Sequence, residues 1–123
     1  MKKELQDKLV EKYPEIFQEI GMPPEKSCMA WGIDVGDGWY ELIDNLCDTL
    51  KDLQDGNMII AAQIKEKFGG LRFYVYSANK KQFDAIDEAE KLSYKICEKC
   101  GTKEGVSQTG GWIKTLCENC KNI

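Results

Sequence analysis

Four of the six cysteines lie in two Cys-x-x-Cys pairs, Cys97–Cys100 and Cys117–Cys120, with sixteen residues between the inner cysteines. Each short pair can hold one edge of a metal ion. Together the pairs supply the four thiolates that a tetrahedral structural zinc ion requires. The spacing therefore predicts a site in which one zinc ion is bound by Cys97, Cys100, Cys117 and Cys120.

Two other interpretations of the cysteine pairs stay open: two disulfides, or a redox-active dithiol beside an unrelated second pair. Disulfides are typical of secreted chains, and a redox Cys-x-x-Cys is expected near a βαβ unit, which the sequence does not indicate. Zinc is therefore the favoured interpretation. Metal-binding thiolates in turn point to a reducing, cytoplasmic compartment.

The predicted site is closed to chemistry at the metal. A catalytic zinc keeps one coordination position open for water, whereas four thiolates fill the tetrahedral shell. The chain also contains no histidine, the side chain that serves most often as a general base. We expect the ion to stabilise the fold of the C-terminal quarter rather than to take part in catalysis.

The composition is that of a folded, acidic domain. The chain has 123 residues, 42% of them hydrophobic and 31% charged, which favours a globular over a disordered chain. Four thiolates each subtract one charge and Zn²⁺ adds two, which takes the formal net charge from −4 to −6. This sign opposes non-specific attraction to nucleic acid or anionic membranes. The longest apolar run, residues 58–62, is too short for a bilayer, and no signal peptide is indicated.

Apolar periodicity predicts helices over residues 3–20, 39–53 and 80–96, the first interrupted at Pro14. Alternation of apolar and polar residues predicts strands over 58–65 and 71–77, joined by a turn in which Gly69 and Gly70 can take positive φ. The predicted fold class is α+β, with helices packed on a small antiparallel β-hairpin or sheet. We expect a core at 1–96 and a zinc-binding unit at 97–123, packed together as one compact domain.

Two further cysteines and two large side chains have structural interpretations. Cys47 lies in the apolar stripe of the helix predicted over 39–53, so we expect a buried thiol rather than a nucleophile. Cys28 lies in the loop that follows Pro23 and Pro24, and its expected state is a packed free thiol. In the same loop Met29 and Trp31 are expected to pin the chain to the core.

An acidic group offers an enzyme alternative. Asp34, Asp37 and Glu41, with Asp44, could hold a divalent cation and support metal-dependent catalysis. Their spacing lacks the alternate ligands and the closing glutamate of a calcium loop. The favoured interpretation is a turn, in which Asp37 caps the helix that follows.

One face of the second predicted strand is aromatic and basic. Arg72, Tyr74 and Tyr76 point to the same side, with Lys65 and Lys67 nearby, and such a face could stack bases and hold phosphate, with help from Lys114. The competing and favoured interpretation is that a helix covers both tyrosines and that Arg72 pairs with a cross-strand glutamate. The candidate binding face comprises Lys65, Lys67, Arg72, Tyr74, Tyr76 and Trp31.

The C-terminal motif resembles a treble-clef zinc finger of the GATA type. The matching residues are Cys97-x-x-Cys100-Gly101, Trp112 and Leu116-Cys117-x-Asn119-Cys120. The resemblance implies a zinc knuckle, a hairpin that carries Trp112, and a short helix that starts at the second cysteine pair. GATA-type fingers continue into a helix and a basic tail that enter DNA, whereas this sequence stops at residue 123, so we expect no DNA reading by the finger.

A wider resemblance covers most of the chain. Gly-Asp-Gly-Trp at 36–39, the segment with Lys-Glu-Lys-Phe-Gly-Gly-Leu-Arg-Phe-Tyr at 65–74, and Gly-Trp-Ile-Lys-Thr-Leu-Cys at 111–117 are similar to a group of small uncharacterised proteins encoded by phages and prophages. The resemblance implies a viral or mobile-element product that works in a host cytoplasm. It implies no activity.

The sequence therefore leads to three functional hypotheses, of which the first is favoured. Phage-like origin, acidic charge and a closed metal site favour a non-enzymatic protein that binds a host protein, with an inhibitor of a host defence system as one case. The first alternative is a nucleic-acid or nucleotide-binding protein that uses Arg72, Tyr74 and Tyr76. The second is a metal-dependent enzyme built on the acidic group.

Overall fold

The computed structural model describes residues 1–121. Its first helix, α1, spans Lys3–Lys12 and ends where Tyr13 leaves helical geometry, immediately before Pro14. The helix predicted over 3–20 is therefore too long, because proline cannot donate the next helical hydrogen bond and the chain continues as turns. The apolar periodicity was nevertheless informative, since Ile16 and Phe17 are buried in those turns.

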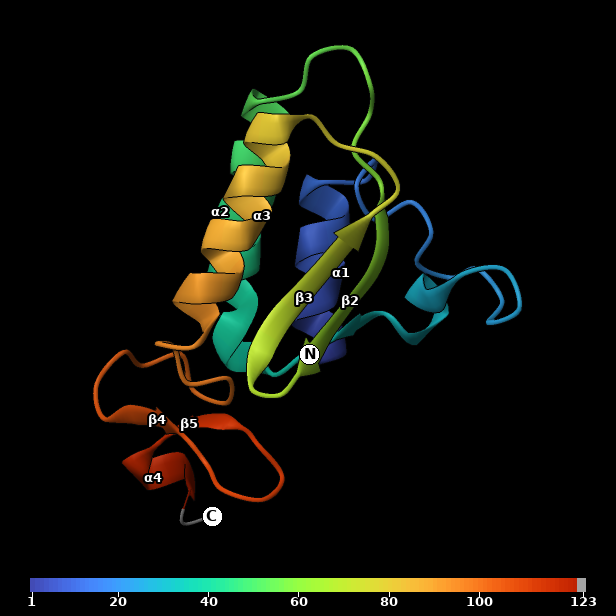
Figure 1. Ribbon diagram of the computed structural model, residues 1–123. Coiled ribbons are helices and arrows are strands. Elements are labelled where there is room, and N and C mark those ends of the chain that lie inside the picture. The colour runs from blue at the N-terminus through green and yellow to red at the C-terminus, as the bar shows by residue number, and fades with distance from the viewer. Residues whose placement is uncertain (122–123) are drawn as a thin grey trace.

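Two longer helices lie side by side next to the antiparallel hairpin of β2 (Ala61–Lys67) and β3 (Gly70–Val75) (Figure 1). Helix α2 spans Tyr40–Asp52 and buries Leu42, Ile43, Leu46, Cys47 and Leu50, which confirms the predicted stripe. Helix α3 spans Lys80–Ser93 and begins with a capping box between Asn79 and Gln82. The Gln82 side chain also donates to the Leu50 carbonyl at 3.0 Å, so a buried amide joins the two helices.

The core sheet has three strands, in the order β1 (Ile33–Asp34), β2 (Ala61–Lys67) and β3 (Gly70–Val75). Strands β2 and β3 form the predicted antiparallel hairpin. Strand β1 was not predicted, and it pairs with β2 in parallel, so the sheet is mixed rather than antiparallel. With α2 between them, β1 and β2 form a short βαβ unit, but the cysteine pairs lie outside it.

The turn between β2 and β3 differs from the prediction at one position. The two central residues are Phe68 and Gly69, with φ of 54° and 84°, whereas Gly70 is the first residue of β3. Positive φ at both central residues is the mark of a type I′ hairpin turn, whose twist matches that of the strands. A phenylalanine therefore occupies a position where Asn, Asp or Gly is preferred.

The C-terminal segment forms a separate two-stranded sheet below the helices in Figure 1. Strand β4 (Val106–Gln108) pairs antiparallel with β5 (Thr115–Cys117), and α4 (Glu118–Lys121) follows directly. We refer to residues 97–121 as the cysteine unit.

Two glycines in the loop before α2 allow the cysteine unit to approach the core. The loop contains the 3₁₀ turn η2 (Asp37–Trp39), and the Gly38 amide donates to the Glu98 carbonyl at 2.7 Å. A Cβ atom on Gly38 would lie 2.1 Å from the Cys97 carbonyl oxygen, and one on Gly36 would lie 2.3 Å from the Glu98 carbonyl oxygen. Backbone therefore packs on backbone here, and no larger residue fits without movement.

A second contact joins the cysteine unit to the β2–β3 turn. The Thr115 hydroxyl donates to the Gly69 carbonyl at 2.5 Å, and a Cβ atom on Gly69 would lie 2.9 Å from the Thr115 hydroxyl oxygen. The Lys114 ammonium of the cysteine unit also donates to the Glu66 carboxylate of β2 at 2.8 Å. The indole N–H of the buried Trp39 also donates to the Ile96 carbonyl, which fixes the chain where it enters the unit.

A polar network joins α1 to α2. The Tyr13 hydroxyl donates to the Asp44 carboxylate at 2.6 Å, and Lys12 donates to the same carboxylate at 3.0 Å. Burial raises the pKa of Asp44, but the hydrogen bonds from Tyr13 and Lys12 outweigh that effect and lower it. Burial and the Asp44 carboxylate raise the pKa of Tyr13. The network therefore stabilises a neutral phenol and a charged carboxylate at neutral pH.

We predict that Tyr13→Phe lowers the free energy of unfolding by about 1–3 kcal/mol at pH 7, because it removes a hydrogen bond to a charged, partly buried acceptor. Urea denaturation followed by circular dichroism measures the change. Tyr40→Phe is the matched control, since the Tyr40 hydroxyl makes no side-chain hydrogen bond within residues 1–121. Equal stabilities for the Tyr13→Phe and Tyr40→Phe variants would contradict the assignment.

We predict that Gly38→Ala destabilises the metal-loaded protein by roughly 1–3 kcal/mol, because the new methyl group overlaps the Cys97 carbonyl. Gly38 has no positive φ, so the cost is steric rather than conformational. Gly110→Ala is the matched control, since a Cβ atom there meets nothing within 4 Å, and its effect should stay within about 0.5 kcal/mol. Thermal unfolding of both variants tests the contact, and indistinguishable melting curves would refute it.

Candidate metal centre

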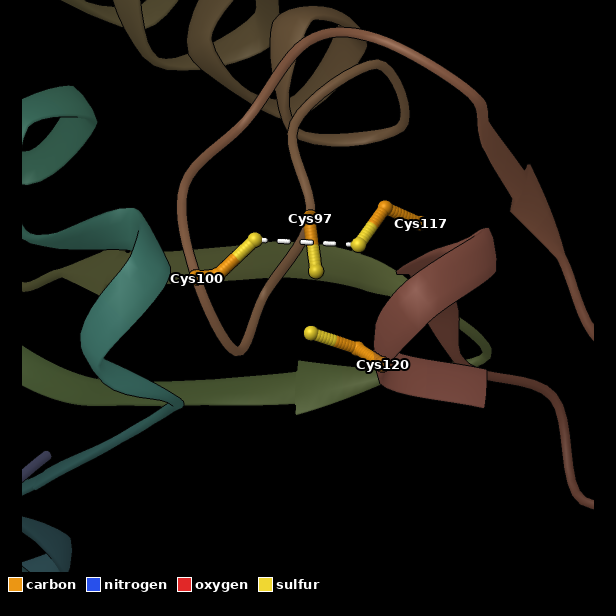
Figure 2. Close-up of side chains that lie close together, drawn as sticks. All are labelled: Cys97, Cys100, Cys117 and Cys120. Carbon is orange, nitrogen blue, oxygen red and sulfur yellow. Dashed lines mark hydrogen bonds between the residues drawn. The ribbon is translucent and has the colours of Figure 1, made fainter. Parts of the chain in front are cut away.

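The four predicted cysteines meet at one point. Their sulfur atoms all lie within 4.8 Å of one another, and Figure 2 shows them directed toward a common centre. Four thiolates bound at about 2.3 Å to one tetrahedral ion stand about 3.8 Å apart. The Cys100 and Cys117 sulfurs are 3.7 Å apart, which matches that spacing and is far longer than a disulfide. All six cysteines of the chain are free thiols.

Local backbone structure positions the first pair. Beyond α3 the chain turns at Cys97 and Cys100, where the Gly101 amide donates to the Cys97 carbonyl at 2.8 Å and the Cys97 amide donates to the Thr102 carbonyl at 2.9 Å. Gly101 has φ of 84°, a conformation that glycine adopts without strain. This tight turn brings both sulfurs to the same side, as the Cys-x-x-Cys-Gly spacing predicts.

The second pair comes from the β4–β5 hairpin. Cys117 is the last residue of β5 and lies opposite Val106 of β4. Helix α4 begins at the next residue and carries Cys120 back toward the centre within one turn. The predicted hairpin and short helix are therefore present, and Trp112 lies in the loop between the strands.

The charges at the site favour a bound cation. Burial raises the pKa of Cys97, but amide hydrogen bonds from Cys100, Cys117 and Lys99 outweigh it and bring the pKa down to about 6. The pKa of Cys120 rises to about 12, first through its hydrogen bond with Cys117 and then through burial and the other sulfurs. Four adjacent thiolates repel one another, and a divalent cation at their centre removes that penalty.

The donor set limits both the metal and its chemistry. Soft thiolate ligands select zinc, copper(I) or iron–sulfur centres over magnesium or calcium. The arrangement can hold a metal ion, and four thiolates in a tetrahedral shell leave no position for water. Cys97 and Cys117 are buried while Cys100 is exposed, so an ion here would lie at the edge of the unit.

The candidate binding face is partly assembled. Lys65 and Arg72 lie directly opposite each other on β2 and β3. Tyr74 is 47% exposed and Tyr76 is 59% exposed, so the interpretation that a helix covers them is wrong. Arg72 is ion-paired, but its partner is Glu90 of α3 and not a cross-strand glutamate. The only arginine of the chain is therefore already engaged within the fold.

The remaining members of that face lie at its margins. Trp31 is 71% exposed in the 3₁₀ turn η1 (Cys28–Trp31), which packs on β2. The expectation that Trp31 pins the loop is wrong, whereas Met29 is fully buried and does so. Lys67 is exposed at the end of β2, and its ammonium lies 5.6 Å from the centre of the Phe68 ring.

Two of the four acidic residues, Asp37 and Asp44, have structural partners. The Asp37 carboxylate accepts the Lys2 amide at 2.8 Å, so Asp37 is not the N-cap of α2, whose N-cap residue is Trp39. Asp44 belongs to the Tyr13 network. Within residues 1–121 the four cysteines are the group whose ligand atoms converge, and Asp34, Asp37 and Glu41 form no such group.

The two other cysteines differ from each other. Cys47 is fully buried, and burial raises the pKa of its thiol, which fits the predicted inert core residue. Cys28 is exposed, which contradicts the expected packed thiol. Cys28 is the first residue of η1, and the buried residue of that turn is Met29.

Sequence reasoning missed two exposed aromatic residues. Phe68 is 64% exposed and Trp112 is 83% exposed, and both lie at hairpin turns. The Lys-Phe-Gly-Gly segment held a usable signal, because a two-residue turn centred on Phe68 and Gly69 places the phenylalanine at the tip. Trp112 precedes β5, which begins only at Thr115, so it lies in the hairpin loop, a placement that the resemblance to a hairpin with a tryptophan did not specify.

The described helices include none with the length and apolar character that a bilayer-spanning segment needs. Comparison of the chain with protein-family models, with curated proteins and with solved structures found no match. The interpretation of the site therefore depends on its geometry alone.

Proposed function

We propose that the four cysteines bind one zinc ion whose role is structural. Zinc is the ion best suited to four thiolates in a tetrahedral shell, and its filled d shell makes it redox-inert. The observation that carries this proposal is the convergence of the Cys97, Cys100, Cys117 and Cys120 sulfurs within 4.8 Å. The amide hydrogen bonds to Cys97 support it, because they stabilise a thiolate before an ion binds.

We further propose that the zinc-loaded protein is non-enzymatic and acts by binding another protein. Exposed aromatic side chains favour this function, since Tyr and Trp are enriched at the energetic centres of protein interfaces. Trp31, Tyr74 and Tyr76 each expose close to half of their surface or more. A filled metal shell and the lack of histidine support the absence of catalysis.

Nucleic-acid binding is the weaker candidate. Tyrosines on a strand can stack bases, but phosphate recognition depends on available cations. Arg72 is paired with Glu90 and Lys114 with Glu66, which leaves Lys65 and Lys67 on a chain of net charge −4. The resemblance to phage-encoded proteins makes a host protein the expected partner, with a component of a host defence system as one case.

We predict that the purified protein carries one zinc ion per chain, and that Cys117→Ser abolishes stoichiometric zinc binding and unfolds the cysteine unit. Structural zinc of this kind contributes on the order of 10 kcal/mol to folding. Native mass spectrometry gives the stoichiometry, and amide hydrogen exchange reports the unfolding. Cys28→Ser is the matched control and should leave both unchanged. Full zinc occupancy in the Cys117→Ser variant, or a different metal in the native protein, would contradict the assignment.

We predict a stoichiometric complex with a protein from a bacterial lysate and only weak, strongly salt-dependent binding to oligonucleotides. Because the complex would depend on apolar contacts, its Kd should change less than about tenfold between 50 and 200 mM salt, whereas phosphate contacts lose far more. Mass spectrometry identifies the captured protein, and calorimetry with the purified pair measures Kd. Failure to reconstitute any 1:1 complex from purified components would count against protein binding.

A further inference from the structure

The β2–β3 turn contacts the β4–β5 hairpin. The Gly69 carbonyl in the β2–β3 turn accepts the Thr115 hydroxyl, and a Cβ atom on Gly69 would lie 3.3 Å from the Ile113 side chain. Phe68 precedes Gly69 in the chain and is 64% exposed, and Trp112 precedes Ile113 and is 83% exposed. We call Lys67, Phe68, Trp112 and Ile113 the hairpin-tip surface.

Phe68 is held in an unfavourable backbone conformation. It is the only non-glycine with positive φ among the described residues, and bulky side chains rarely enter that region. The turn is fixed from behind, since the Glu66 carboxylate accepts the Gly69 amide at 2.8 Å and the Lys114 ammonium at 2.8 Å. Phe-Gly is therefore a less stable turn than Asn-Gly would be at these two positions. An unfavourable backbone conformation of this kind is typical of functional sites, which points to a function for the Phe68 side chain.

The backbone beneath Trp112 is also fixed. The Thr109 hydroxyl donates to the Trp112 carbonyl at 2.8 Å and accepts the Lys114 amide at 2.9 Å, and the Thr109 amide donates to the Lys114 carbonyl at 2.8 Å. The loop is closed by its own hydrogen bonds while the indole ring stays in solvent. An aromatic side chain on a preformed loop loses little conformational freedom on binding, which is what an interface anchor requires.

The charge beside the aromatic rings is positive. Lys67 lies over Phe68 and has no ion-pair partner within residues 1–121. The neighbouring Glu66 is only 13% exposed and is neutralised by Lys114. On a chain of net charge −4, this surface therefore presents two aromatic rings, an aliphatic side chain and one cation, which complements an apolar pocket with a carboxylate at its rim.

We propose that the hairpin-tip surface docks into an apolar, acid-rimmed pocket of a partner protein, with Phe68 and Trp112 as its anchors. This inference rests on the proposed protein-binding function and assigns that function to a surface other than the Arg72, Tyr74 and Tyr76 face. A membrane surface is the competing occupant. It is disfavoured because the protein is acidic and the surface carries a single cation.

The variants that test the surface separate binding from stability. Phe68→Asn installs the preferred Asn-Gly turn, so it should melt at or above the temperature of the wild type while it removes one anchor. Trp112→Ser removes the other anchor from a solvent-exposed position. Phe83→Ser is the matched control, since Phe83 is 47% exposed near the start of α3 and belongs to neither hairpin.

The probe is a random-peptide library displayed on yeast and selected on the zinc-loaded wild-type protein, followed by calorimetry with the synthesised peptides. We expect enriched peptides to combine apolar residues with Asp or Glu. Their affinity should fall at least about tenfold with Phe68→Asn and with Trp112→Ser, and remain unchanged with Phe83→Ser.

Three results would overturn the assignment. Peptides that lose affinity only with Tyr74→Ser or Tyr76→Ser would move binding to the strand face and leave the protein-binding function intact. Trp112-dependent binding to phosphatidylglycerol vesicles, without peptide enrichment, would make the occupant a membrane. No enrichment at all, together with no protein partner, would remove both the surface and the proposed function.

Discussion

The convergence of four sulfur atoms is the constraint on which the C-terminal quarter of the molecule depends. Of the described residues from 97 to 121, only Cys97, Glu98, Thr115 and Cys117 are buried. Such a segment buries too little apolar surface to offset the entropy of ordering its backbone. The zinc ion that we propose would supply what an apolar core otherwise supplies, because each cysteine pair would hold the other in place through it.

The cysteine unit is also joined to the core through backbone contacts that tolerate no side chain. Gly38 packs against the turn at Cys97, and Gly69 packs against Thr115. Lys114 reaches from the unit to Glu66 of β2, and Glu98 accepts the Gly36 amide. These contacts explain why the glycines flank Asp37 and follow Phe68, since each allows two chain segments to approach more closely than Cβ atoms permit.

The sequence predicted those parts of the structure that local patterns determine. The apolar stripe defined α2, and the Cys-x-x-Cys spacing defined the metal centre, because both depend on residues close together in the chain. Strand β1 has two residues, too few for any alternation to be seen. The partner of Arg72 and the exposure of Tyr74 depend on where α3 packs, and that placement is set by long-range contacts such as the Gln82–Leu50 bond.

The metal centre and the hairpin-tip surface are physically coupled. Trp112 lies on the loop of the β4–β5 hairpin, whose second strand ends at the candidate ligand Cys117, whereas Phe68 lies on a hairpin of the core. Loss of the ion would release the loop that carries Trp112 and leave Phe68 in place. The two hairpins contact each other only while the cysteine unit is folded, so the structural ion that we propose would determine whether the surface is complete.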